Sequence, residues 1–139
     1  MRIFVPTIQS AGTAFMIDHL FAGWPLICPA NKEQGILFRH VYLEGPRWPE
    51  WALPCDFTIT PMRSLALMEA SMRKRTMHTI NQFYDLYAAW IRMVVERDAY
   101  VLQIDEPEKA QKELDRFNFD TGLDLKSDWR VVPSWDVVR

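Results

Sequence analysis

Four short apolar segments alternate along the chain with stretches of helical periodicity, and this alternation limits the possible folds most strongly. The strand-like segments are 2–6, 37–44, 55–60 and 99–105. The helical segments are 13–23, 64–75, 77–97 and a stretch from Pro107 to about Phe117, and Pro61 is expected to end the third strand. Strands separated by helices need crossover connections. The pattern therefore predicts a three-layer α/β domain with a mainly parallel sheet of about four to five strands.

Composition supports one folded domain over residues 1–139. Hydrophobic residues make up 49% and aromatic residues 13% of the 139-residue chain, which excludes intrinsic disorder. The 16 Lys and Arg residues nearly balance the 18 Asp and Glu residues, for a net charge of −2. A protein that binds nucleic acid through bulk charge would be strongly basic, so that class is disfavoured.

The two cysteines, Cys28 and Cys55, lack the spacing of a zinc site. We expect free thiols, with a single disulfide as the alternative. The first residues, MRIFVPT, are typical of a strand and not of a signal peptide, and no apolar run is long enough to span a membrane. The chain is therefore expected to be a cytoplasmic protein without metal or membrane contact.

Ligands of parallel α/β sheets bind beyond the carboxyl ends of the strands. After the first strand comes TIQSAGTAFM (7–16), where Gly12 lies between the strand and the start of a helix. Such a turn can hold an anion on free backbone N–H groups at a helix start. An ordinary tight turn is the alternative.

The third strand leads into TPMRSLALMEASMRKR (60–75), in which Arg63 precedes Ser71 by eight residues. A guanidinium at a strand end and a hydroxyl in the following helix can bind one phosphate together. The alternative is that Arg63 pairs with a carboxylate while Ser71 packs in the helix interface.

Together these two segments resemble the sulfotransferase family, P-loop-like enzymes that use 3′-phosphoadenosine 5′-phosphosulfate. The family's first motif, T-Y-P-K-S-G-T-T-W-L, aligns without gaps and retains Thr7, Gly12 and Thr13. Its second motif, R-N-P-x-D-x-x-x-S, shares the interval between Arg63 and Ser71. The later segments AYVLQIDEPEKAQKELDRF (99–117) and SDWR (127–130) are similar to a family strand–helix pair and to its G-D-W-K segment near the nucleotide.

The resemblance implies a truncated, sulfotransferase-like domain and assigns roles to particular residues. Arg63 and Ser71 would hold the 3′-phosphate of the donor nucleotide. His40, near the end of the second strand, would be the general base toward a hydroxyl or amine acceptor, with a strand histidine of no catalytic role as the alternative. The 5′-phosphosulfate would lie against the loop formed by Ser10, Ala11, Gly12, Thr13 and Ala14.

The sequence departs from the family pattern at positions that bear on catalysis. Ser10 stands where the family has a lysine, Leu65 replaces a proline, and the chain has about half the length expected of a full enzyme. Loss of one preorganised cation typically costs on the order of 10²–10³ in rate.

A second hypothesis from a different class is therefore retained. The chain would be a catalytically inactive scaffold that binds a protein, for example a small virus-encoded inhibitor of a host protein. Trp48 and Trp51 lie in a proline-rich loop and would anchor such a contact; the alternatives are a lid over the pocket next to His40 and packing onto the sheet edge. The basic run Arg73–Arg75 is expected to end a helix. The helix 77–97 is expected to be central, or to form a homodimer or a partner groove if one side is exposed. Its apolar residues recur at intervals of three and four: Ile80, Phe83, Tyr84, Tyr87, Trp90, Ile91 and Val94.

Overall fold

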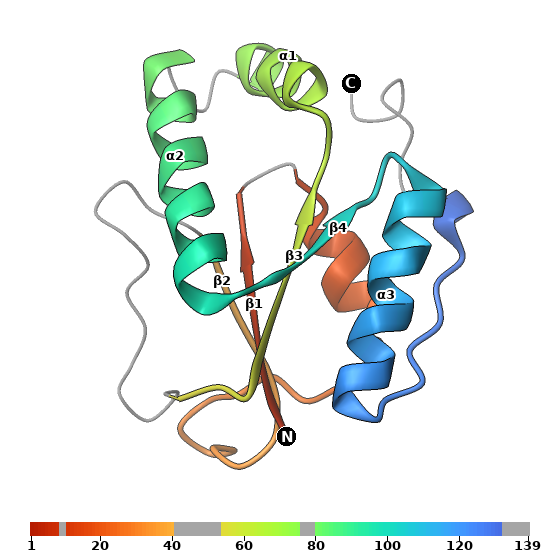
Figure 1. The fold of residues 1–139 in the computed structure, drawn as a ribbon. Helices are drawn as coiled ribbons and strands as arrows, with labels where there is room; N and C mark the ends of the chain where they lie inside the picture. The colour runs from red at the N-terminus through yellow and green to blue at the C-terminus, as the bar shows by residue number, and fades with distance from the viewer. Residues whose placement is uncertain (9–10, 41–53, 76–79, 132–139) are drawn as a thin grey trace.

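The computed structural model describes residues 1–8, 11–40, 54–75 and 80–131 (Figure 1). Ser10, Trp48, Trp51 and the predicted strand residues 41–44 lie outside the described residues.

The described strands form one parallel sheet, as the alternation of segments predicts. The strands are β1 (Arg2–Thr7), β2 (Gly35–His40), β3 (Phe57–Met62) and β4 (Tyr100–Gln103). They lie in the order β2-β1-β3-β4. The fold class is therefore α/β, with β1 and β3 in the middle of the sheet.

Helices connect and cover these strands. The short π-helix η1 spans Phe15–Leu20, α1 spans Leu65–Arg75, α2 spans Ile80–Arg97, α3 spans Pro107–Thr121, and a 3-10 turn, η3, spans Trp129–Val131. Ser64 caps α1, because its Oγ accepts a hydrogen bond from the Leu67 N–H at 3.4 Å. α3 opens with Pro107, where a helix needs no N–H donor.

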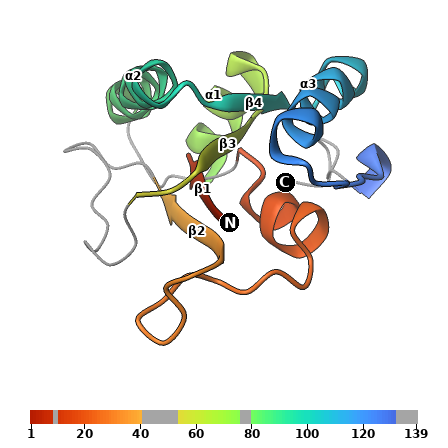
Figure 2. The ribbon, with the colours of Figure 1, turned by 60° about the horizontal axis from the view of Figure 1, so that its bottom comes forward.

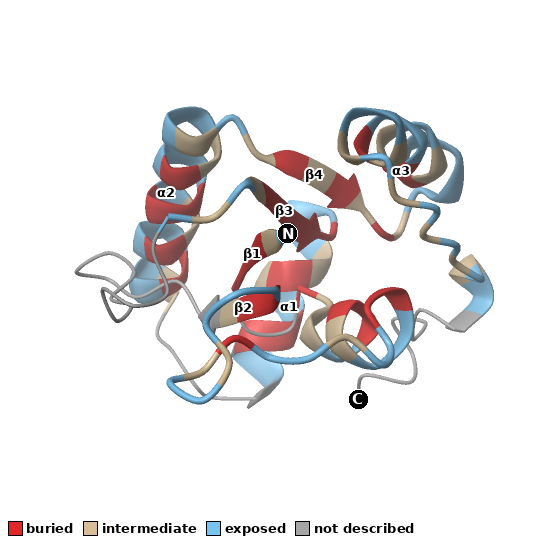
Figure 3. Cartoon of the chain, turned by 90° about the horizontal axis from the view of Figure 1, so that it is seen from below, coloured by how far each residue is buried: buried red, intermediate tan, exposed pale blue. Residues whose placement is uncertain are grey.

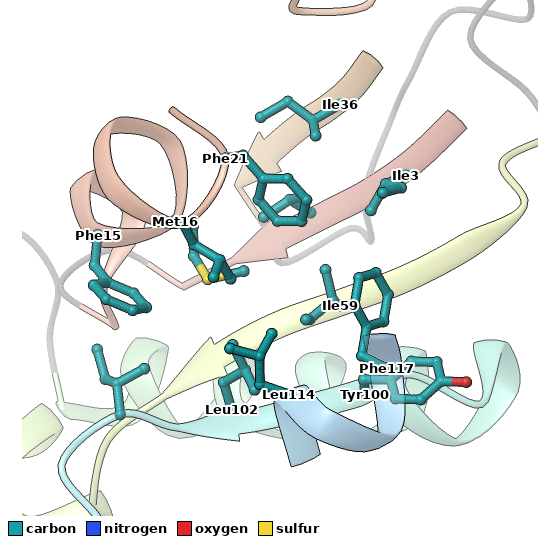
Figure 4. Packing of buried hydrophobic residues seen from close by; sticks show 13 residues of the cluster. Ile3, Phe15, Met16, Phe21, Ile36, Ile59, Tyr100, Leu102, Leu114 and Phe117 are labelled. Carbon is teal, nitrogen blue, oxygen red and sulfur yellow. The ribbon is translucent and has the colours of Figure 1, made fainter. Parts of the chain in front are cut away.

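The helices form two layers on opposite faces of the sheet (Figures 1 and 2). η1 and α3 pack on one face around a core that includes Ile59, Leu102 and Phe117, shown in Figure 4. α1 and α2 pack on the other face around Met68 and Trp90. Alternate strand side chains supply the two cores, as the period of two in a strand requires.

Two prolines explain why β1 and β3 pair over only part of their length. The printed sequence places Pro6 in β1 and Pro61 in β3, yet the ladder between these strands stops after Phe4↔Thr58. The Met62 carbonyl accepts a hydrogen bond from the Ile104 N–H, so the backbone polar groups of Met62 face β4. Successive residues of a strand face opposite neighbours, and the nitrogen of Pro61 therefore faces β1. Neither proline has an N–H to donate, and the ladder cannot continue.

Three expectations are wrong in detail. Pro61 does not end the third strand, because it pairs with Leu102 inside β3 and needs no donor on its β1 side. α3 runs past Phe117 to Thr121, where Gly122 ends it in the left-handed conformation (φ 76°). The spacing in the helical segment 64–75 also predicts Leu65 on one apolar side with Met68 and Met72, but Leu65 lies in the first turn of α1 and is 38% exposed, whereas both methionines are buried.

Candidate functional site

The strand order creates a topological switch point at the carboxyl ends of β1 and β3. β1 is followed in the chain by β2 on one side, whereas β3 lies on its other side. Connections that leave in opposite directions open a crevice between the strands, where ligands of this fold class bind. Because the ladder between β1 and β3 stops early, the two strands diverge toward this edge (Figure 1).

Gly12 brings the loop after β1 against the ends of β3 and β4. Its φ is +120°, and a Cβ at this position would lie 2.4 Å from Ile104 Cδ1 and 3.4 Å from Pro61 Cβ. Only glycine adopts this backbone conformation without strain and permits this approach. The loop residue and the strand end that leads to Arg63 therefore meet, as the predicted site requires.

The remaining described residues of the loop are well anchored. Thr13 Oγ1 donates a hydrogen bond to Thr7 Oγ1 at 3.0 Å, and Thr7 is fully buried. The Ala11 N–H donates to the Ile8 carbonyl at 3.0 Å, and Ala11 is also fully buried. Ala14 is exposed and follows Thr13 into the helical turn. The loop is thus held by contacts within the protein on the side facing the sheet.

Arg63 and Ser71 are both buried near the same edge. Arg63 follows β3 directly and is 5% exposed, and Ser71 lies in α1 and is 2% exposed. Ser71 Oγ has no hydrogen-bond partner among the described residues, so Arg63 does not hydrogen-bond to it. A buried hydroxyl without a partner is unusual in a protein interior and is a candidate ligand-binding group.

His40 is the last residue of β2, where it pairs with Thr7 in the parallel register. This position places His40 at the carboxyl edge of the sheet, where β1 lies between β2 and β3. The SDWR segment also approaches the site: the Trp129 ring lies 5.5 Å from the Phe15 ring, three residues after Gly12. Trp129 Nε1 donates to Gln111 Oε1 at 2.8 Å, which fixes the indole on α3.

Sequence reasoning missed the carboxylate at this edge. Asp105, two residues after the end of β4, accepts a hydrogen bond on Oδ2 from the Ser64 N–H at 2.8 Å. It therefore ties the end of β4 to the start of α1. The only signal in the sequence was an acidic residue at the end of the predicted strand 99–105, at the same edge of the sheet as Arg63.

Sequence reasoning also missed the polar link between β1, β3 and α2. Thr60 Oγ1 donates to the Pro6 carbonyl at 2.7 Å and accepts from Trp90 Nε1 at 2.9 Å. All three groups are buried, and the hydroxyl replaces the missing ladder bond between the strands. Pro6 and Pro61 were the available signal, since each removes a donor.

Other findings concern the cysteines, metals and membranes. Cys28 and Cys55 are free thiols, and burial raises the pKa of Cys55 while the guanidiniums of Arg2 and Arg97 act in the opposite direction. Within the described ranges, no group of three or more His, Cys, Asp or Glu residues could hold a metal ion. None of the described helices has the length and apolar character to cross a membrane.

No protein-family model, curated protein or solved structure matches the chain.

Proposed function

We propose that this chain binds a phosphorylated adenine nucleotide of the sulfotransferase donor type at the carboxyl edge of β1 and β3. The observation that carries the proposal is the close approach of the Gly12 backbone to Pro61, two residues before the buried Arg63, at the switch point of a parallel sheet. Parallel α/β sheets bind ligands at such a switch point. The motif resemblance selects the nucleotide, 3′-phosphoadenosine 5′-phosphosulfate or its product.

Arg63 and Ser71 would bind the 3′-phosphate. A guanidinium can make two parallel hydrogen bonds to phosphate, and a charge-assisted bond of this kind is stronger than a neutral one. The hydroxyl of Ser71, which lacks a partner among the described residues, would gain one. The loop of residues 10–14 would lie along the 5′-phosphosulfate, with Gly12 allowing the backbone to approach it.

Sulfuryl transfer to a hydroxyl or amine is the reaction proposed for the bound donor. The acceptor atom forms a bond to sulfur as the bond from sulfur to the phosphate oxygen breaks, and adenosine 3′,5′-bisphosphate leaves. His40, at the carboxyl end of β2, would take the acceptor's proton. Because Ser10 supplies no cation, we expect turnover to be slower than with a lysine by on the order of 10²–10³.

Binding of adenosine 3′,5′-bisphosphate tests the site, with 5′-AMP as the ligand that lacks the 3′-phosphate. The wild-type chain should bind the bisphosphate more tightly than AMP, as measured by calorimetry. Arg63→Ala should weaken bisphosphate binding by about tenfold or more while leaving AMP binding almost unchanged, because charge-assisted bonds contribute roughly 1.5–3 kcal/mol.

The control is Arg73→Ala, which removes an exposed arginine of α1 that pairs with Glu69 at 3.1 Å. It should leave both affinities unchanged. Arg63→Lys keeps a cation at the buried position and tests whether loss of binding reflects loss of the fold. Equal affinity of the wild-type chain for the bisphosphate and for AMP would reject the 3′-phosphate site and favour the inactive, protein-binding alternative.

The family lysine can be restored at its aligned position. Ser10→Lys should raise the rate of sulfuryl transfer to a small phenol or amine by about 10²-fold, because the new cation stabilises charge that develops on the leaving phosphate. The assay follows release of adenosine 3′,5′-bisphosphate. Ser10→Met, of similar length but neutral, should leave the rate at the wild-type level; an equal gain in both variants would contradict the electrostatic role.

A further inference from the structure

The outward face of α2 carries a continuous apolar stripe that is largely exposed; at its first residue, the Tyr84 hydroxyl donates a hydrogen bond to Glu69 Oε2 of α1 at 2.6 Å. Tyr84, Ala88, Ile91 and Val95 follow one another at intervals of four, three and four residues, so they lie on one side of the helix. Tyr84 is 43%, Ile91 44% and Val95 75% exposed. The opposite side of α2 is buried against the sheet, which Figure 3 shows as alternating buried and exposed turns. α2 thus has a second apolar side that faces outward.

Three exposed charged residues, Asp85, Arg92 and Glu96, border this stripe along one flank. Asp85 and Arg92 carry opposite charges and lie seven residues apart, and Glu96 follows near the end of α2. Helix neighbours that can pair are three or four residues apart, so Asp85 and Arg92 cannot pair within one helix. Neither takes part in the ion pairs formed among the described residues. The other flank holds Tyr87 and Val94, which pack partly against the domain's own core.

This charge pattern is complementary to itself in only one orientation. When two identical helices pack antiparallel across a two-fold axis, each flank meets the same flank of its partner. Asp85 of each copy then lies opposite Arg92 of the other. In a parallel pair the charged flank would instead meet the flank of Tyr87 and Val94. Ala88, near the middle of the stripe, lets the two helices approach closely.

We propose that a second copy of this chain docks on α2 in antiparallel orientation and forms a two-fold symmetric homodimer. The apolar stripe forms the centre of the interface, and two ion pairs between Asp85 and Arg92 border it. One helix from each copy makes a small interface, so the dimer should form reversibly with protein concentration. This proposal is independent of nucleotide binding, because no residue of the candidate site lies on this face.

Sedimentation equilibrium of the full chain over a series of protein concentrations tests the dimer. Asp85→Arg and Arg92→Asp, each alone, place like charges opposite one another twice per dimer. Each should weaken self-association by about tenfold or more, since each reversal replaces two attractions with two repulsions. Mixing the two single variants should restore association as a heterodimer, because each arginine then faces an aspartate.

The double exchange Asp85→Arg with Arg92→Asp should also restore the homodimer, and circular dichroism checks that every variant is folded. Lys112→Glu reverses an exposed charge on α3 and should leave association unchanged. A wild-type chain that stays monomeric throughout the series would overturn the proposal. So would a dimer that the single reversals leave intact, or single variants that fail to associate when they are mixed.

Discussion

The two seams that flank β1, where it lies beside β2 and beside β3, are held together in different ways. Between β1 and β2 the ladder is continuous from Arg2↔Gly35 to Thr7↔His40. Between β1 and β3 it stops after Phe4↔Thr58, although both strands continue. The first seam is closed by backbone hydrogen bonds along its whole length, whereas beyond Phe4 the second is held by the Thr60 side chain. A parallel sheet can therefore open at its switch point without losing its core, provided that a side chain satisfies the freed backbone groups.

The largest effect should come from removing the hydroxyl that joins the open seam. Thr60→Val leaves the Pro6 carbonyl and Trp90 Nε1 buried without their partner, and we expect the free energy of unfolding to fall by about 2–4 kcal/mol. Denaturant unfolding measures this change. Thr58→Val is the matched control, because Thr58 is a buried threonine of the same strand inside the paired part of the seam. Similar losses in both variants would show that the Thr60 hydroxyl has no special role.

A smaller effect is expected where the loop meets the open seam. Gly12→Ala places a Cβ against Ile104 and forces a strained φ, so stability should fall by about 2 kcal/mol. Gly23→Ala is the control, because its φ is also positive (+81°) but nothing lies within 4 Å of the new Cβ. That variant should lose only about 1 kcal/mol. The affinity of the Gly12→Ala variant for adenosine 3′,5′-bisphosphate should also fall. An equal loss of stability in the two variants would mean that the contact with Ile104 is unimportant.

The smallest effect concerns β4, which pairs with β3 on the side away from β1, and it appears only at alkaline pH. Burial and a hydrogen bond to Asp120 raise the pKa of Tyr100, the first residue of β4, to about 12. The folded chain then keeps this proton to higher pH than the unfolded chain, whose tyrosine titrates near pH 10. The free energy of unfolding should therefore fall as pH rises from about 10 to 12. Tyr100→Phe should remove this part of the decline; an unchanged slope would contradict it.

Much of the architecture could be predicted because strands and helices have different periods. The alternation of segments was sufficient for a parallel sheet, and the intervals of three and four residues located the buried face of α2, including Phe83 and Trp90. The same intervals assigned Tyr84 and Ile91 to the apolar pattern without showing that they face outward. Periodicity identifies apolar faces, but it does not show which neighbour covers each of them.

The candidate site could be predicted only in outline. The sequence placed Gly12 and Arg63 after two strands, and the structure brings the Gly12 loop to the end of β3. The partners of Asp105 and Thr60 could not be predicted, because each hydrogen bond joins residues that are distant in the chain. The roles of Arg63, Ser71 and His40 in nucleotide binding and transfer stay predictions.

Local residue chemistry determined the order of strands and helices, the capping of α1 by Ser64 and the positions that lack a backbone donor. Only the tertiary structure decided that Pro6 and Pro61 occupy the same seam, so that two separate losses of a donor produce one opening. The physical reason is that a missing N–H is a property of one residue, whereas a broken ladder depends on which strand lies beside it.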